Sequence, residues 1–127
     1  MTIYGIGTDI VTIARMSELY ARHGERSLDK LLAPEEIPLC QKAQEPARYL
    51  AKRFAAKEAL GKALGTGIRA PVLLPSIAVI NDALGKPSLR FLNELAAYMQ
   101  ERKLTAHLSI SDERDTAIAF VVLEQQA

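Results

Sequence analysis

The chain has 127 residues, of which 49% are hydrophobic and 24% charged, and its formal net charge is +1. This composition is typical of one globular domain and excludes both a disordered chain and a strongly basic nucleic-acid binder. No apolar run is long enough to cross a membrane and no secretory signal is visible, so we expect a cytoplasmic protein with no membrane partner.

The hydrophobic periodicity predicts a single domain over residues 1–127. In chain order, we expect a strand over 2–11, a helix over 12–23, a helix that starts at Pro34, and a long helix over 47–64. These are followed by strands over 76–81 and 88–91, a helix over 93–103, and a hairpin of strands over 105–111 and 116–124. Helices and antiparallel strands mix here without strict βαβ alternation. The predicted fold class is therefore α+β, with an antiparallel sheet packed against the long helix.

The first strand places two glycines ahead of an acid. Gly5, Gly7 and Asp9 share one face of this strand. Glycine weakens a strand, so two glycines on one face indicate close approach by something else. Asp9 then lies at the end of a cleared track, where its carboxylate can meet a cation or a phosphate-bound metal.

The long helix carries one acid among several bases. At about 100° per residue, Glu58 and Lys62 lie one turn apart on the side of Ala55 and Ala59. These small residues permit close approach by another backbone or by a ligand, although an ordinary surface pair between residues i and i+4 explains the same spacing. Lys57 lies on the other, apolar side, where we expect its stem to snorkel towards water.

The last hairpin has one polar and one apolar face on its first strand. His107 and Ser109 alternate with Leu108 and Ile110, which predicts either a half-exposed strand or a binding surface. The strand over 116–123 is apolar on both faces. We therefore expect it to be the internal strand of the sheet.

Charge is unevenly distributed along the chain. Between residues 42 and 69, seven bases oppose two acids, an excess that attracts a polyphosphate or an acidic protein. A solvated helix face accounts equally well for some of these bases. The rival to an enzyme is thus a non-catalytic module that binds RNA or an acidic protein, although aromatic content of only 6% disfavours RNA recognition by stacking.

Four blocks of sequence, in this order, resemble the holo-[acyl-carrier-protein] synthases, the short class of 4′-phosphopantetheinyl transferases. They are Gly5-Ile6-Gly7-Thr8-Asp9-Ile10, Arg53-Phe54-Ala55-Ala56-Lys57-Glu58-Ala59 continuing to Lys62 and Gly65-Thr66-Gly67, Gly85-Lys86-Pro87, and His107-Leu108-Ser109-Ile110-Ser111. The resemblance implies the 4′-phosphopantetheinyl transferase fold. It also implies transfer of the 4′-phosphopantetheine arm from coenzyme A to a serine of apo acyl carrier protein, for fatty acid biosynthesis, with release of adenosine 3′,5′-bisphosphate.

The same resemblance assigns roles to the matching residues. Asp9 and Glu58 match the family's Mg²⁺ ligands, and one cysteine and two histidines are too few for a zinc cluster. Catalysis is assigned to Glu58 and Lys62, with Lys62 neutralising charge on the phosphorus oxygens. The base that takes the serine proton stays open among Glu58, a metal-bound water and Lys57. The predicted coenzyme A contacts are Arg53, Lys62, Gly65, Thr66, Gly67, Lys86, Pro87, His107 and Ser109.

Partners also follow from the resemblance. Positions like Arg15 and Arg22 dock the acidic carrier protein in this family, whereas an ordinary amphipathic helix balanced by its own acids would show the same spacing. The longer transferases contain two similar halves with the coenzyme between them, and this chain supplies one half. We therefore expect a homotrimer whose active sites are shared between subunits.

Overall fold

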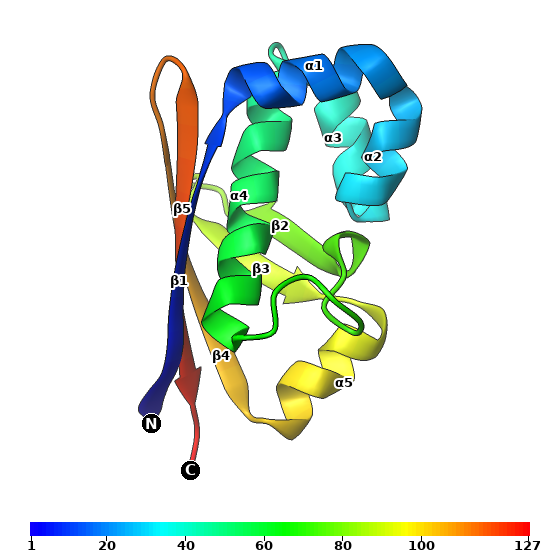
Figure 1. The fold of residues 1–127 in the computed structure, drawn as a ribbon. Coiled ribbons are helices and arrows are strands. Elements are labelled where there is room, and N and C mark those ends of the chain that lie inside the picture. Colours follow the sequence, from blue (N-terminus) through cyan, green and yellow to red (C-terminus); the bar gives the residue numbers. More distant parts are fainter.

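A three-stranded antiparallel sheet forms one side of the molecule, and every helix lies on the other side (Figure 1). The computed structural model describes all residues from 1 to 127. The strand order is β1 (Thr2–Thr12), β5 (Thr116–Gln125) and β4 (Leu104–Asp112), with both pairs antiparallel. The strand that is apolar on both faces, β5, is therefore internal, as predicted.

The remaining elements lie on the inner side of this sheet (Figure 1). The helices are α1 (Ile13–His23), α2 (Glu25–Leu31), α3 (Ile37–Lys42), α4 (Pro46–Leu64) and α5 (Asn93–Glu101). Two short 3₁₀ turns, η1 (Pro34–Glu36) and η2 (Leu74–Ser76), precede α3 and the hairpin of β2 (Ile77–Asn81) and β3 (Pro87–Phe91). The predicted α+β class and antiparallel sheet are confirmed.

The helix α4 runs between the sheet and the other helices and forms the centre of the core (Figure 1). Pro46 occupies its first turn, where a missing N–H costs nothing, and Gly65 ends it in the left-handed conformation with φ 80°. Its alanines at 51, 55, 56 and 59 are all fully buried. A central helix of small residues lets neighbouring elements come close on several sides.

One helix was not predicted. Gly24 ends α1, with its N–H bonded to the Tyr20 carbonyl, but the chain turns there and begins α2 at once. Leu28 and Leu31 of α2 are buried in the core. A seven-residue helix directly after a glycine stop gives too short a periodic signal to separate it from a loop.

The outer face of the sheet is apolar and exposed. Its large exposed side chains are Ile3, Tyr4, Ile6, Ile10, Ile118 and Phe120. Four of them, at 3, 6, 10 and 120, are between 45% and 68% exposed, and no helix covers this face in Figure 1. No helix of the chain is both long and apolar enough to cross a membrane.

Candidate active site at the contact of β1 and α4

The glycines of β1 lie directly against the backbone of α4. A Cβ atom added to Gly5 would lie 2.0 Å from the carbonyl oxygen of Ala63, and one added to Gly7 would lie 2.0 Å from that of Ala59. Real Cβ atoms never come so close, so only glycine permits this packing. The predicted close approach is confirmed, and its partner is a helix backbone. Two residues beyond Gly7, this contact brings Asp9 alongside α4.

Asp9, Glu58 and Lys62 meet at this contact. The Lys62 ammonium lies 3.1 Å from Asp9 Oδ1 and donates a hydrogen bond to the Thr8 carbonyl at 2.9 Å. Burial raises the pKa of the Glu58 carboxyl, and the negative charge of Asp9 raises it further. Lys62 and Arg15 act in the opposite direction on Glu58. Two carboxylates and one ammonium thus form a single electrostatic unit.

The donor set of this unit fits a hard divalent cation. Both acids offer carboxylate oxygens. The Lys62 ammonium lies beside Asp9, so a positive charge is stabilised at this position. The chain has no group of three or more His, Cys, Asp or Glu side chains that could enclose a metal ion. A cation held here would take its other ligands from water and substrate, as Mg²⁺ characteristically does.

The turn after α4 extends the unit. Gly65 and Gly67 both have positive φ, 80° and 68°, and the Gly67 N–H bonds back to the Gly61 carbonyl at 3.0 Å. The Thr66 hydroxyl donates to the Gly67 carbonyl at 2.8 Å. The glycine-containing segment after α4 therefore begins less than one helical turn beyond Lys62, at the same end of the helix.

A second cluster forms between α4 and the β2–β3 turn. Arg53 donates from Nη2 to Asn81 Oδ1 at 2.9 Å. A cavity of about 110 Å³ opens here, lined by Lys52, Arg53, Asn81, Gly85, Pro87, Ile110 and Asp112. Two predicted coenzyme contacts from distant parts of the sequence, Arg53 and Pro87, thus share one cavity, and Lys86 lies between two of its lining residues in the chain.

His107 and Ser109 lie on the other side of the sheet. They pair in register with Val122 and Phe120 of β5, and both are exposed on the outer face. His107 Nε2 lies 2.6 Å from Glu124 Oε1. Asp9 instead pairs with buried Ala119 and points to the inner face. One chain therefore does not bring His107 together with the Asp9–Glu58 unit.

The prediction that Lys57 snorkels to water is wrong. Its side chain is fully buried, and its ammonium donates to the Leu31 carbonyl at 2.7 Å, Glu36 Oε1 at 2.6 Å and the Leu74 carbonyl at 3.0 Å. Burial lowers the pKa of Lys57 to about 8, and the charge of Glu36 opposes that shift. Three acceptors satisfy all three of its protons, so Lys57 has no free position from which to act as a base.

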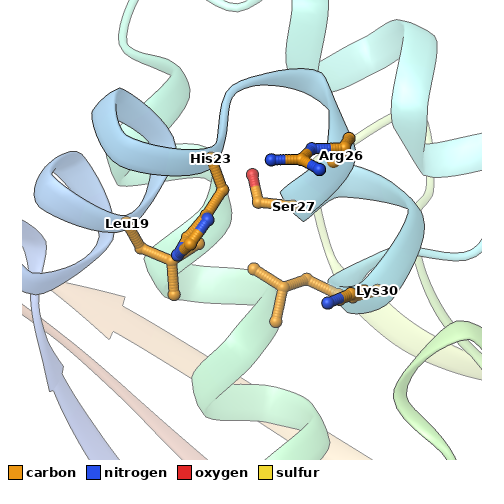
Figure 2. Close-up of a pocket in the computed structure, with 6 residues that line it drawn as sticks. Leu19, His23, Arg26, Ser27 and Lys30 are labelled. Atoms are coloured by element: carbon orange, nitrogen blue, oxygen red, sulfur yellow. The ribbon is translucent and has the colours of Figure 1, made fainter.

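The helix α1 presents Arg15 and Arg22 next to two surface hollows. One hollow, of about 200 Å³, is lined by Arg15, Glu18, Leu19, Arg22 and His23. The larger, of about 550 Å³, lies between α1 and α2, where Leu19 and His23 come from α1 and Ser27 and Lys30 from α2 (Figure 2). This larger of the two hollows is separate from the Asp9–Glu58 unit. Arg15 also lies over the Phe54 ring of α4, 5.4 Å from its centroid.

Comparison with known proteins identifies the family. The model of the 4′-phosphopantetheinyl transferase superfamily matches residues 5–121. The chain belongs to this superfamily. A holo-[acyl-carrier-protein] synthase from Dechloromonas aromatica is 58% identical over 96% of this chain and 98% of its own length. One from Azoarcus is 53% identical over the same shares.

Solved structures of holo-[acyl-carrier-protein] synthases have the same fold. The enzyme from Neisseria meningitidis matches with a TM-score of 0.94 and 46% identity, over 98% of this chain and 100% of the other. The enzyme from Helicobacter pylori, in complex with coenzyme A, matches with a TM-score of 0.81 and 32% identity, over 94% and 99%. The predicted family, fold and enzymatic nature are confirmed, and the rival interpretation as a non-catalytic module is not supported.

Three residues around Arg53 escaped the sequence analysis of this transferase. Glu36 is fully buried and bonds Lys57, the Ala33 N–H and the Val79 N–H. Tyr49 and Asn81 contact the Arg53 guanidinium. The position of Glu36 just after Pro34 signalled a helix start, and nothing in the spacing linked any of the three to Arg53.

Proposed function

We propose that this transferase moves the 4′-phosphopantetheine arm from coenzyme A to a serine of apo acyl carrier protein and releases adenosine 3′,5′-bisphosphate. The observation that carries the proposal is the meeting of Asp9, Glu58 and Lys62 where β1 packs on α4. The names of the full-length relatives, and the coenzyme A complex of one of them, support both substrates. Fatty acid synthesis is the process that such a carrier serves.

Asp9 and Glu58 are the residues that would hold Mg²⁺. When bound there, the ion would supply positive charge to the pyrophosphate of coenzyme A. Phosphoryl transfer is accelerated chiefly by positioning and charge neutralisation, and the residues here provide both. The glycine contact fixes the two carboxylates, and the half-exposed Lys62 ammonium can turn from Asp9 to a phosphorus oxygen.

Proton removal from the carrier serine is the remaining chemical task. Of the two side chains considered for it, only Glu58 lies in the charged unit with Asp9 and Lys62. Lys57 is buried among three acceptors away from this unit. We therefore assign the protein's own part in this step to Glu58.

The coenzyme site requires a second copy of the chain. His107 and Ser109 are expected to contact coenzyme A, yet they lie on the opposite sheet face from Asp9. A homotrimer with shared active sites would bring the outer face of one subunit to the inner site of the next. The exposed isoleucines of β1 support this arrangement, because such an apolar face is typical of an interface.

The docking of the carrier is assigned to Arg15 and Arg22 of α1. Both are exposed and line a hollow with Leu19 and one acid, Glu18, so two guanidiniums flank an apolar contact. The neighbouring hollow adds Arg26 and Lys30, and neither of these two forms an ion pair within the chain (Figure 2). An acidic protein surface is the partner whose charge complements this one.

The test is a transfer assay read by mass spectrometry. The protein is mixed with coenzyme A, Mg²⁺ and several apo carrier proteins, and each carrier is weighed. We expect the carrier to gain one phosphopantetheine arm, no gain when its acceptor serine is replaced by alanine, and no gain after chelation of the metal. Absence of a mass gain on every carrier would refute the transferase proposal.

Light scattering tests the assembly separately. We expect about three times the 13.9 kDa chain mass. Mixing Glu58→Ala with His107→Ala subunits should restore part of the lost activity, because one intact site can form from two defective chains. A fully active monomer would refute the shared site.

A further inference from the structure

The guanidinium of Arg53 contacts Tyr49 and Asn81, two residues that have no part in the proposed chemistry. Its side chain is only 9% exposed, and its Cζ lies 4.0 Å from the centroid of the Tyr49 ring. Nη2 donates to Asn81 Oδ1 at 2.9 Å. Stacking and an in-plane hydrogen bond together fix both the tilt and the rotation of the guanidinium plane.

Arg53 keeps this position although one of its donors is left without a partner. Nε is buried, makes no hydrogen bond, and lies 4.0 Å from Glu36 Oε2, beyond hydrogen-bond distance. A buried donor without a partner costs about 1–3 kcal/mol. An arginine that served only to neutralise Glu36 would close this gap. The contact with Asn81 instead holds the guanidinium towards the cavity that it shares with Pro87.

Asn81 connects Arg53 to the turn that follows it. Its Nδ2 donates to the Gly85 carbonyl at 3.0 Å, while its Oδ1 accepts from Arg53. Within the turn, Asp82 Oδ1 accepts from the backbone N–H groups of Leu84 and Lys86 at 2.8 and 2.9 Å. The Asn81 amide is therefore the hydrogen-bonded link between Arg53 and the turn.

The chemistry of these neighbours requires an amide at position 81. A guanidinium can only donate and a carbonyl can only accept, so the bridging group must offer one acceptor and one donor at opposite ends. Aspartate offers no donor and leucine offers neither. Among side chains of this length, asparagine alone satisfies both neighbours.

We propose that Asn81 is a positioning residue for coenzyme A: it fixes Arg53 relative to the Gly85–Lys86–Pro87 turn. The proposal rests on the proposed function and on the expectation that Arg53, Lys86 and Pro87 contact coenzyme A. A site assembled before the ligand arrives loses less conformational entropy on binding. Asn81 thus lowers the KM for coenzyme A through Arg53, without touching the reacting atoms.

The experiment compares Asn81→Leu, Asn81→Asp and the control Ser88→Ala, each also in an Arg53→Ala background. Ser88 is exposed on the neighbouring strand of the same hairpin, and its hydroxyl makes no hydrogen bond. We expect Asn81→Leu to raise the coenzyme A KM about tenfold, which matches loss of one charge-assisted hydrogen bond. The kcat and the carrier KM should stay within about twofold of wild type. Asn81→Asp, which keeps the acceptor for Arg53, should have a smaller effect.

The double variants distinguish positioning from a general structural role. In the Arg53→Ala background, Asn81→Leu should add little further loss, because its effect passes through the missing arginine. Calorimetric titration with coenzyme A gives the same comparison without turnover. Three results would each overturn the proposal. They are additive losses in the double variant, an unchanged coenzyme A KM in folded Asn81→Leu, and a change in the carrier KM equal to that in the coenzyme A KM. If Asn81→Leu does not fold, Asn81→Ser replaces it. Failure of the transferase proposal is distinguishable, because wild-type protein would then add no mass to any carrier.

Discussion

Replacing Gly7 by alanine tests whether the β1–α4 contact builds the active site. The added Cβ would lie 2.0 Å from the Ala59 carbonyl oxygen and 2.7 Å from the Ala63 nitrogen. Ordinary contacts need about 3.5 Å, so the strand must withdraw from the helix by roughly 1.5 Å. Both overlapping atoms belong to a helix backbone, which cannot rotate aside as a side chain would.

The expected cost has a structural and a catalytic part. Overpacking of this kind costs about 1–3 kcal/mol, and we expect the upper end because no side chain can yield. For a chain of this size, this corresponds to a melting temperature lower by roughly 10 °C. Withdrawal of the strand separates Asp9 from Glu58. A displacement of about 1 Å at reacting groups can cost 100-fold in rate, so kcat should fall by about that factor.

Gly24→Ala is the matched control for this experiment. Gly24 has a positive φ of 59°, and a Cβ added there would meet nothing within 4 Å. Backbone strain there costs about 1–3 kcal/mol, a similar loss of stability, at the end of α1 and outside the charged unit. Thermal denaturation and the mass-based transfer assay at saturating carrier measure both variants. A Gly7→Ala protein with wild-type melting temperature and kcat would refute the reasoning, as would equal losses of kcat in both variants.

Four further predictions follow from individual side chains. Glu58→Ala should abolish Mg²⁺-dependent turnover without unfolding the chain, because the half-buried acid is not needed for packing; near-normal turnover in the folded variant would remove the metal site. Lys57→Met should lower the free energy of unfolding in urea by about 3–5 kcal/mol, since the buried Glu36 carboxylate loses its ammonium partner and keeps only the contact with Arg53 at 4.0 Å; a loss below about 1 kcal/mol would contradict this. Burial and a nearby carboxylate raise the pKa of Cys40 to about 11. On the order of one thiol in a thousand is therefore ionised at pH 8, and a thiol reagent should label it only after denaturation; rapid labelling of the native protein would disprove this. Arg15→Glu combined with Arg22→Glu should raise the carrier KM at least about tenfold and leave coenzyme A affinity unchanged; an unaltered carrier KM would exclude this surface.

Much of the fold was predictable because its elements carry clear periodic signals. The apolar character of both faces of 116–123 identified the internal strand, and the proline and glycine at the two ends of α4 marked its limits. The glycines of β1 predicted close packing, but they could not say whether a ligand or a backbone would fill the space. That answer depends on which element folds against the strand, which a local pattern does not record.

The parts of the site that were missed depend on long-range contacts. Lys57 has a helical position that looks suited to snorkelling, and only the fold brings Leu31, Glu36 and Leu74 around its ammonium. Asn81 ends a strand 28 residues after Arg53, and no spacing rule links the two. Polar networks of this kind are specified jointly by several segments, so each segment alone shows an ordinary pattern.

The glycines of β1 also connect the active site to the assembly of subunits. In an ordinary two-layer domain, the large residues of a strand face the core. Here a helix backbone fills the inner side at Gly5 and Gly7, so Ile6 and Ile10 must face outwards, where they are 61% and 63% exposed. The close packing that brings Asp9 alongside α4 therefore also creates an apolar outer face, and that face carries His107. A larger inner residue would disturb the proposed metal site, and a polar outer residue would weaken the proposed interface between subunits. Under the proposed trimer, β1 therefore serves the active site with one face and the subunit interface with the other. A sequence change on either face is limited by what the other face requires.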